Sequence, residues 1–117
     1  MTGRVTGIGG LFFRARDPNA LAAWYRTHFA IVESGGMPWQ TEAGGTVFAP
    51  FAADSDYFRK DRPFMVNFRV EGFDALVARL TASGIAVKVL AGESYGRFAH
   101  LEDPEGNPIE LWEPITP

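Results

Sequence analysis

The stretch SYGRFAHLEDPEGNPIELWEP, residues 94–114, decides more about the fold than any other part of this chain. Residues 97–102 and 108–113 can each be read as an extended strand whose side chains alternate between two faces. Between them lies DPEGN, residues 103–107, in which Pro and Gly stand at positions that favour a turn. The stretch is therefore predicted to be a β-hairpin.

Side-chain alternation assigns the residues of this hairpin to two faces. The apolar residues that we expect to lie on the buried side of the sheet are Leu101, Ile109 and Leu111. The residues of the other parity are Phe98, His100, Glu110 and Trp112. A His and a Glu at the same level of adjoining antiparallel strands have Cβ atoms about 5 Å apart, within reach of a hydrogen bond or a shared metal. We therefore expect any chemistry on this second face.

Length and composition indicate one globular domain. The chain has 117 residues, which is enough for a single hydrophobic core but short for two. Its 46% hydrophobic and 21% charged residues are typical of a soluble protein. No apolar run approaches the roughly 20 residues that span a bilayer, and the first residues lack a convincing signal-peptide pattern. We expect a cytoplasmic protein without a membrane role.

The absence of cysteine and the net charge exclude several kinds of site and partner. Because the chain has no cysteine, it has no disulfide, no thiolate metal site and no cysteine nucleophile, which also suits a cytoplasmic location. The formal charge is −3, with 11 basic against 14 acidic residues, so there is no basic field of the kind that nucleic-acid binding requires. Nucleic acid is therefore not an expected partner.

Two segments carry the signals of helices. Asp17 and Pro18 supply an N-cap and a first helical residue for residues 19–29, whose apolar side chains recur at helical spacing. Residues 73–83 show the same kind of apolar stripe, and Gly84 directly after them suits a left-handed C-terminal cap. Each segment is predicted to be a helix that lies on a sheet.

The remaining extended runs are separated by Gly and Pro and are predicted to be strands. In the first half they are residues 5–16, 31–34, 37–43 and 46–51. In the second half they are residues 64–70 and 85–90, followed by the hairpin. The polar run AADSDYFRKDR, residues 52–62, is predicted to connect the two halves.

The two halves repeat each other at an offset of 55 residues. Phe13 and Arg14 then superpose on Phe68 and Arg69, and three further identities fall within the two predicted helices. Both halves also read strand, helix, three strands, so the identities coincide with the same order of elements. We predict an α+β fold of two βαβββ modules in a single domain, with the helices outside a curved sheet that surrounds a shared cavity. The modules span about residues 5–51 and 63–114, with residues 52–62 between them.

In these segments the chain resembles the vicinal oxygen chelate superfamily, also called the glyoxalase/bleomycin-resistance/extradiol-dioxygenase superfamily. The resemblance covers essentially the whole chain and rests on FFRARDPNALAAWYRTHFAI, VNFRVEGFDALVARLTASGIAV and, above all, the closing YGRFAHLEDPEGNPIELWEP. It implies the paired βαβββ fold and frequent dimerisation, so we expect a homodimer. For the metal-dependent members it also implies a divalent ion, held by His or Glu residues on the first and last strands of the modules.

Most of the metal ligands that the resemblance implies are missing here. The first-strand His position falls on Gly10, and the equivalent position 55 residues later is Met65. The first-module carboxylate would fall within residues 46–49, TVFA, which contain no acid. Only Glu110 matches a ligand position. One carboxylate does not make a metal site, so we expect no cofactor and disfavour a divalent metal.

Glu110 and His100 are the candidate catalytic residues. A carboxylate that points into a partly apolar cavity should have a raised pKa and can act as a general base, with His100 as its proton-shuttling partner. In the alternative interpretation Glu110 is an inherited carboxylate held by His100 or by an Arg, and His100 is ordinary lining of the cavity. The sequence leaves both interpretations open.

Candidate ligand-binding residues are expected on the same face. Arg14 and Arg69 occupy equivalent positions and suit a carboxylate or phosphate of the ligand, but the favoured alternative is an ion pair with an acid such as Asp17, Glu71 or Glu113. An apolar wall could contact either a ligand or a second subunit. The other candidate ligand-binding residues are Asn67, which carries an amide, and the residues of this wall: Phe12, Phe48, Met65, Phe98 and Trp112.

Three functions are compatible with this sequence. The first is a metal-independent, glyoxalase-like lyase or isomerase that acts on a small organic molecule by proton transfer. The second is a non-catalytic protein that binds or sequesters a planar or aromatic compound, as bleomycin-resistance proteins of the resembled superfamily do. The third is a structural role in which Phe and Trp side chains fill the cavity. The missing metal ligands favour binding, whereas the His/Glu pair favours catalysis.

Overall fold

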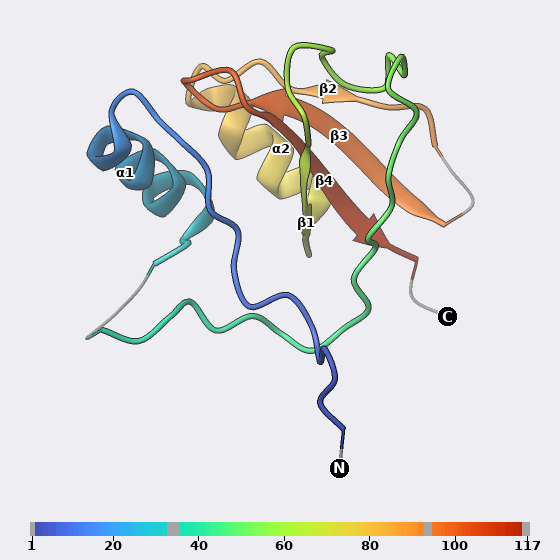
Figure 1. Cartoon of the computed structure of the whole chain (residues 1–117). Helices are drawn as coiled ribbons and strands as arrows, with labels where there is room; N and C mark the ends of the chain where they lie inside the picture. Colours follow the sequence, from blue (N-terminus) through green and yellow to red (C-terminus); the bar gives the residue numbers. More distant parts are fainter. Residues whose placement is uncertain (1, 33–35, 93–94, 116–117) are drawn as a thin grey trace.

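The structure is a computed structural model that describes residues 2–32, 36–92 and 95–115. Its elements in chain order are α1 (Pro18–Phe29), β1 (Val66–Arg69), α2 (Phe73–Ala82), β2 (Lys88–Val89), β3 (Gly96–Glu102) and β4 (Pro108–Pro114). The strands form one sheet in the order β1-β4-β3-β2 (Figure 1). β1 runs parallel to β4, and the other neighbours are antiparallel. This arrangement confirms the predicted α+β class and the strand, helix, three-strand order of the second half.

Local caps mark both ends of α1 and the C-terminal end of α2. The Asp17 carboxylate accepts a hydrogen bond from the Ala20 backbone N–H at 3.0 Å, and Pro18 occupies the first turn of α1. Ala30 caps the other end in a left-handed conformation, with φ of 55°. Gly84 follows α2 at φ of 85°, as predicted. Among the described residues, no helix combines the length and hydropathy needed to cross a membrane.

The core lies between the two helices and one face of the sheet. α1 contributes Leu21 and Tyr25, α2 contributes Phe73 and Leu80, and the hairpin supplies the rest. The predicted inward residues of the hairpin are buried: Leu101, Ile109 and Leu111. The hairpin therefore has the predicted parity, and its other face is free for a site.

Asp103 organises the turn between β3 and β4. This carboxylate is 4% exposed, and it accepts hydrogen bonds from the backbone N–H groups of Glu105 and Asn107 at 2.9 and 3.0 Å. The Asn107 amide and the Tyr25 hydroxyl donate to its other oxygen, each at 2.7 Å. Burial, together with the hydrogen bond to the Asp103 carboxylate and its charge, raises the pKa of Tyr25 well above its ordinary value. The turn is thereby joined to α1.

A second contact fixes the start of α1 on the same turn. The Glu105 carboxylate accepts hydrogen bonds from the backbone N–H groups of Arg16 and Asp17, at 2.6 and 2.9 Å. These N–H groups stand at the helix N-terminus, where an anion is favourable. The first-half helix is therefore held on the core of the second half.

Three of the four strands predicted in the first half, at residues 5–16, 37–43 and 46–51, are wrong. Residues 2–15 and 38–51 contain no strand, and the prediction for residues 31–34 lies partly outside the described residues. A strand needs a neighbour for its backbone groups, and these runs instead remain extended and largely exposed (Figure 1). In the second half, the strand predicted at residues 85–90 is shortened to β2.

Candidate functional site

The open face of the sheet carries a polar row that crosses three strands. The register pairs Asn67 of β1 with Glu110 of β4, and Glu110 with His100 of β3. The three side chains lie on the face opposite the helices, because their neighbours in each strand point into the core. Glu110, in the middle, is 6% exposed. The sheet register therefore brings together three of the residues that the sequence predicted for the site.

Three side chains hydrogen-bond the Glu110 carboxylate. Asn67 Nδ2 donates to Oε1 at 2.7 Å. The Tyr57 hydroxyl donates to Oε2 at 2.5 Å, and His100 Nε2 lies 2.8 Å from the same oxygen. The Tyr57 ring also meets the His100 ring edge to face, with centroids 5.0 Å apart. Both oxygens of this buried carboxylate are thus engaged.

These contacts lower the pKa of Glu110, so the expectation of a raised pKa is wrong. Burial by itself raises the pKa of a carboxyl group, because it disfavours the charged form. The hydrogen bonds from His100, Tyr57 and Asn67 stabilise that charged form and together outweigh burial, which leaves the pKa below its ordinary value of 4.5. Glu110 is ionised at neutral pH and can only accept, so His100 Nε2 carries the proton that faces it.

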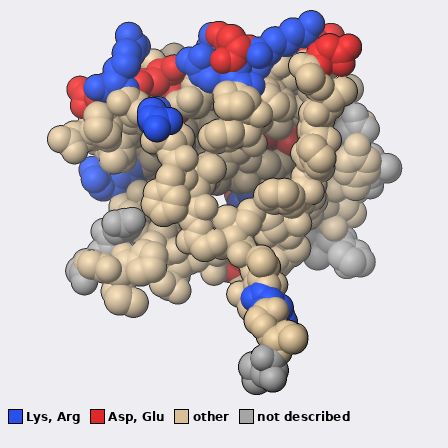
Figure 2. Space-filling model, in the orientation of Figure 1, with Lys and Arg blue, Asp and Glu red and all other residues tan. Residues whose placement is uncertain are grey.

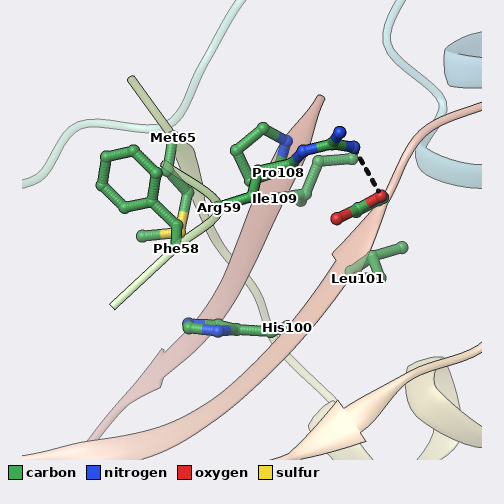
Figure 3. Close-up of a pocket in the computed structure, with 8 residues that line it drawn as sticks. Phe58, Arg59, Met65, His100, Leu101, Pro108 and Ile109 are labelled. Atoms are coloured by element: carbon green, nitrogen blue, oxygen red, sulfur yellow. Dashed lines mark hydrogen bonds and ion pairs between the residues drawn. The ribbon is translucent and has the colours of Figure 1, made fainter. Parts of the chain in front are cut away.

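A small pocket opens beside His100. Its volume is about 190 Å³, below the roughly 300–1,000 Å³ of sites that enclose drug-sized ligands. Figure 3 shows Phe58 and Met65 together at one side of the pocket, with the His100 ring below them. The lining residues are Phe58, Arg59, Met65, His100, Leu101, Glu102, Pro108 and Ile109. The pocket accommodates one ring or substituent of a ligand, and the rest would lie on the open sheet face.

Phe98 and Trp112 form an aromatic surface in the next row of the same face. The register pairs them across β3 and β4, and their rings stack with centroids 6.2 Å apart and an interplanar angle of 9°. Tyr95 meets Phe98 edge to face at 5.7 Å, and its carbonyl accepts a hydrogen bond from Trp112 Nε1 at 3.3 Å. These contacts present flat aromatic surface beside the polar row, which suits a planar ligand.

Four predicted ligand-binding residues are not part of this cluster. The Arg69 guanidinium donates to the backbone carbonyls of Glu42 and Gly45, at 2.8 and 2.9 Å, and in the described residues it forms no ion pair with an acid. Arg14 is exposed, and Phe12 and Phe48 are 92% and 85% exposed. Phe12 and Phe48 therefore do not join the apolar wall that was expected around the site.

Tyr57 is a site residue that the sequence reasoning missed. It lies in residues 52–62, interpreted only as a connection, and reaches Glu110 across 53 residues of chain. One signal was available, because the pair Tyr57 and Phe58 stands inside an otherwise polar and charged run. Aromatic side chains in such a run need a surface to contact, and here that surface is the open face of the sheet.

Two arginines fasten the Tyr57 segment to the closing hairpin. Arg59 donates to the Gly106 carbonyl at 3.1 Å and to the Glu102 carboxylate at 3.2 Å. Arg62 donates to the Glu105 carbonyl at 2.9 Å. Figure 2 shows charged groups of both signs along the upper edge of the molecule in that view, while the face below is mostly uncharged. The segment is therefore anchored at its charged end, with Tyr57 over the site.

The donor set does not fit the divalent ion of the metal-dependent members of the resembled superfamily. Glu110 and His100 are hydrogen-bonded to each other, and the other ligand positions are Gly10 and Met65. In the part of the chain that the structure describes, no group of three His, Cys, Asp or Glu side chains is placed to hold a metal ion. Two mutually bonded ligands do not make such a site.

A second pocket, of about 350 Å³, lies at the start of α1 and shares no lining residue with the first. Its lining includes Leu21 and Trp24 of the helix. The Glu105 carboxylate at this pocket is already bonded to backbone N–H groups of Arg16 and Asp17. Although this pocket is larger, we place the candidate site at Glu110, where polar groups converge.

Comparisons with known proteins give a consistent result. The sequence matches the family model described as "Glyoxalase-like domain" over residues 10–112, and no curated protein matches. The structure is similar to TnmS3, an antibiotic binding protein from Streptomyces sp. CB03234, with 24% identity, coverage of 97% of this chain and 100% of that chain, and a TM-score of 0.64. It is also similar to a glyoxylase/bleomycin resistance protein/dioxygenase domain from Frankia sp. EAN1pec, with 18% identity, coverage of 96% and 100%, and a TM-score of 0.61.

A shorter similarity involves a glyoxalase/bleomycin resistance protein from Streptomyces sp. CB03234, which is 38% identical over 41% of this chain and 42% of that chain, with a TM-score of 0.39. The two similarities over nearly the whole chain show a shared fold. The family match spans almost all described elements, from the residues before α1 to β4. The chain therefore belongs to the glyoxalase-like domain family of the vicinal oxygen chelate superfamily.

Proposed function

We propose that this protein binds a small planar organic molecule on the open face of its sheet and does not transform it. The observation that supports binding over catalysis is the state of Glu110. A general base works best when its pKa lies near the operating pH and its oxygen faces the substrate. The pKa of Glu110 is lowered instead, and both its oxygens are bonded to side chains of the protein.

The surroundings of Glu110 suit an aromatic ligand. A flat compound can lie on the Phe98 and Trp112 surface and insert one ring beside Met65 and Phe58. TnmS3, which shares the fold, is an antibiotic binding protein. We extend that class of ligand to this chain as part of the proposal.

The proposal is tested by titrating the protein with a panel of planar aromatic antibiotics. We expect saturable binding of at least one compound, which is recovered with unchanged mass. Trp112→Ala should weaken binding about three- to tenfold, because one stacking surface is lost. Trp39→Ala is the matched control, since Trp39 is 42% exposed and does not line the pocket, and it should leave the affinity unchanged. Absence of binding across the panel, or conversion of the bound compound, would contradict the proposal.

A second candidate, a metal-independent lyase or isomerase, is favoured by one observation. His100 lines the pocket, and the buried Glu110 carboxylate holds its Nε2 at 2.8 Å, as in sites where a carboxylate orients a catalytic imidazole. In that case His100, rather than Glu110, would exchange the proton with the substrate. The distinguishing result would be turnover that His100→Asn abolishes while binding remains.

We also propose that the protein acts without a tightly bound divalent metal. The support is chemical, because Gly10 and Met65 carry no ligand and Glu110 is bonded to three donors. Elemental analysis of protein purified without chelator should find far less than one Zn, Ni, Mn or Fe per chain. About one ion per chain, lost in Glu110→Ala, would refute this.

A homodimer is the assembly that we propose. Six large apolar side chains of the first half are more than half exposed: Val5, Ile8, Phe12, Met37, Val47 and Phe48. Large apolar side chains exposed in this number are typical of an interaction surface, so we expect a second copy to cover them. Sedimentation should give a dimer at micromolar concentration, and a monomer there would contradict the proposal.

A further inference from the structure

We propose that Lys88 is a ligand-binding residue, and that the planar ligand carries an acidic group, such as a carboxylate, which pairs with the Lys88 ammonium. This inference rests on the proposed binding function and adds the chemical class of the ligand. It follows from the register of β2, from the way in which the charges of the polar row are paired, and from the path that a ligand can take across the open face.

The polar row continues onto the fourth strand of the sheet. The register pairs Lys88 of β2 with His100 of β3, which is itself paired with Glu110 of β4. Val87, the neighbour of Lys88, packs against the hydrophobic core on the helix side of the sheet. Alternation therefore directs the Lys88 side chain to the open face. Because β1 and β2 are the two edges of the sheet, Lys88 and Asn67 stand at opposite ends of the row (Figure 1).

The two charged residues of this row are in different states. Glu110 is 6% exposed, and side chains of the protein hydrogen-bond both of its oxygens. Lys88 is exposed, and in the part of the chain that the structure describes no hydrogen bond or ion pair joins its ammonium. Glu110 is thus closed to a ligand, whereas Lys88 can still pair with an anion.

The acid diagonal to Lys88 on the neighbouring strand pairs with another residue. Glu102 lies two residues after His100 on the same face of β3, a position from which a long side chain can reach Lys88. Its carboxylate instead pairs with Arg59 at 3.2 Å, on the segment that carries Tyr57. The position beside the Lys88 ammonium therefore suits an acidic group that comes from the ligand.

A ligand on the proposed path passes beside Lys88. The pocket beside His100 lies on one side of the polar row, and the Phe98 and Trp112 surface lies on the other. A compound that extends from the pocket to this surface crosses the row at His100, so one of its edges faces β2. The backbone N–H of Leu90 donates to the Phe98 carbonyl at 3.0 Å, which keeps β2 beside β3 along this path. Neighbouring strands are about 5 Å apart, so the Lys88 side chain can reach a substituent on that edge.

The test uses three naphthalenes of nearly the same shape but different charge: 2-naphthoate, 2-naphthamide and 2-naphthamidine. Each is titrated against the wild-type protein at low ionic strength, and binding is followed by naphthalene fluorescence. We expect 2-naphthoate to bind about three- to tenfold more tightly than the neutral amide, and the cationic amidine to bind least tightly. The formal charge of the protein, −3, would by itself favour the cation, so a preference for the anion identifies a local positive partner.

Three variants show whether that partner is Lys88. Lys88→Met removes the charge and should abolish the preference for 2-naphthoate without changing the affinity for 2-naphthamide. Lys88→Arg keeps a cation and should retain the preference. Arg26→Met is the matched control, because Arg26 is exposed on α1, on the helix side of the sheet, and its loss changes the net charge by the same amount. This control should leave the preference unchanged.

Equal binding of the three compounds to the wild type, or tightest binding of 2-naphthamidine, would overturn the inference. A preference for 2-naphthoate that persists in Lys88→Met would do the same. If no naphthalene binds while a compound of the antibiotic panel does, the inference is overturned and the proposed function stands. The proposed function fails separately, when no compound of any class binds the wild-type protein.

Discussion

The two halves of this chain share a sequence repeat and a helix, but in the described residues only the second half forms a sheet. In the second half, Phe68 of β1 packs against the rings of Tyr25 and Phe29, at centroid distances of 6.3 and 5.4 Å. Its counterpart Phe13, 55 residues earlier, also meets the Tyr25 ring, at a centroid distance of 6.4 Å, but it lies outside any strand and is 44% exposed. The same residue type at equivalent positions thus has different surroundings, because only one copy has a strand beside it.

The closing turn is where the two halves differ most in chemistry. Asp103 accepts four hydrogen bonds through its carboxylate, and Gly106 adopts a φ of 84°. At the same 55-residue offset the first half has Phe48 and Phe51. Phenylalanine cannot accept those hydrogen bonds and rarely adopts that conformation. A strand pattern that lacks its turn residues therefore does not form a hairpin within one chain.

The largest difference in stability should appear between substitution of a buried side chain in the second half and of an exposed side chain in the first half. Leu111→Ala removes a fully buried side chain of β4 and should lower the free energy of unfolding by about 2–5 kcal/mol. Phe12→Ala changes a residue that is 92% exposed and should alter it by less than about 0.5 kcal/mol in the monomer. Urea unfolding followed by circular dichroism measures both.

Equal losses of unfolding free energy in the two variants at low protein concentration would contradict this difference between the halves. A loss in Phe12→Ala that appears only as the protein concentration rises would instead explain it. That result would show that the first half is buried against a second copy, since binding to the folded state stabilises it by mass action.

The next effect should come from the turn itself. Asp103→Ala leaves the Tyr25 hydroxyl and the turn N–H groups without their acceptor, and should cost about 2–3 kcal/mol of unfolding free energy. Asp54→Ala, at an exposed position of the connection, is the matched control and should change stability by less than about 0.5 kcal/mol. If the two variants were equally stable, the turn could not explain why only the second half forms a sheet.

Substitution of Glu110 in the polar row should have a smaller effect on stability, and this effect should depend on pH. The folded-state pKa of Glu110 is lowered, so the unfolded chain binds more protons as pH falls, and the contribution of Glu110 is present above its ordinary pKa of 4.5 and lost below it. Glu110→Gln should therefore be less stable than the wild type by about 1–2 kcal/mol at neutral pH. The difference should shrink on acidification, and a difference that stays constant from about pH 7 to pH 3 would contradict this.

The smallest effect concerns the link between the halves. Glu105→Ala removes the acceptor of two backbone N–H groups at the start of α1 and should cost about 1 kcal/mol. Glu71→Ala, at an exposed position, is the control and should be nearly neutral. Hydrogen exchange of the first turn of α1 should accelerate in Glu105→Ala alone. Unchanged exchange would show that α1 docks without this contact.

Some parts of this structure could be predicted and others could not, for physical reasons. Asp17, Pro18 and Gly84 indicated both helices because caps act within one turn of chain. Alternation placed His100 and Glu110 on one face because it follows from strand geometry alone. No local rule of this kind predicts the position of Tyr57, because a long irregular connection brings it back to the sheet.

By itself, therefore, the sequence determined the two helices, the closing hairpin and the face on which the polar row lies, because each depends on interactions within a few residues. The tertiary structure alone decided the chemistry of Glu110. Its donors Asn67 and Tyr57 stand 43 and 53 residues away, and together with the hydrogen bond from His100 their hydrogen bonds outweigh the effect of burial and lower its pKa. Tertiary structure also decided that the strand patterns of the first half do not form strands, because a strand is stable only when a neighbouring strand pairs with its backbone.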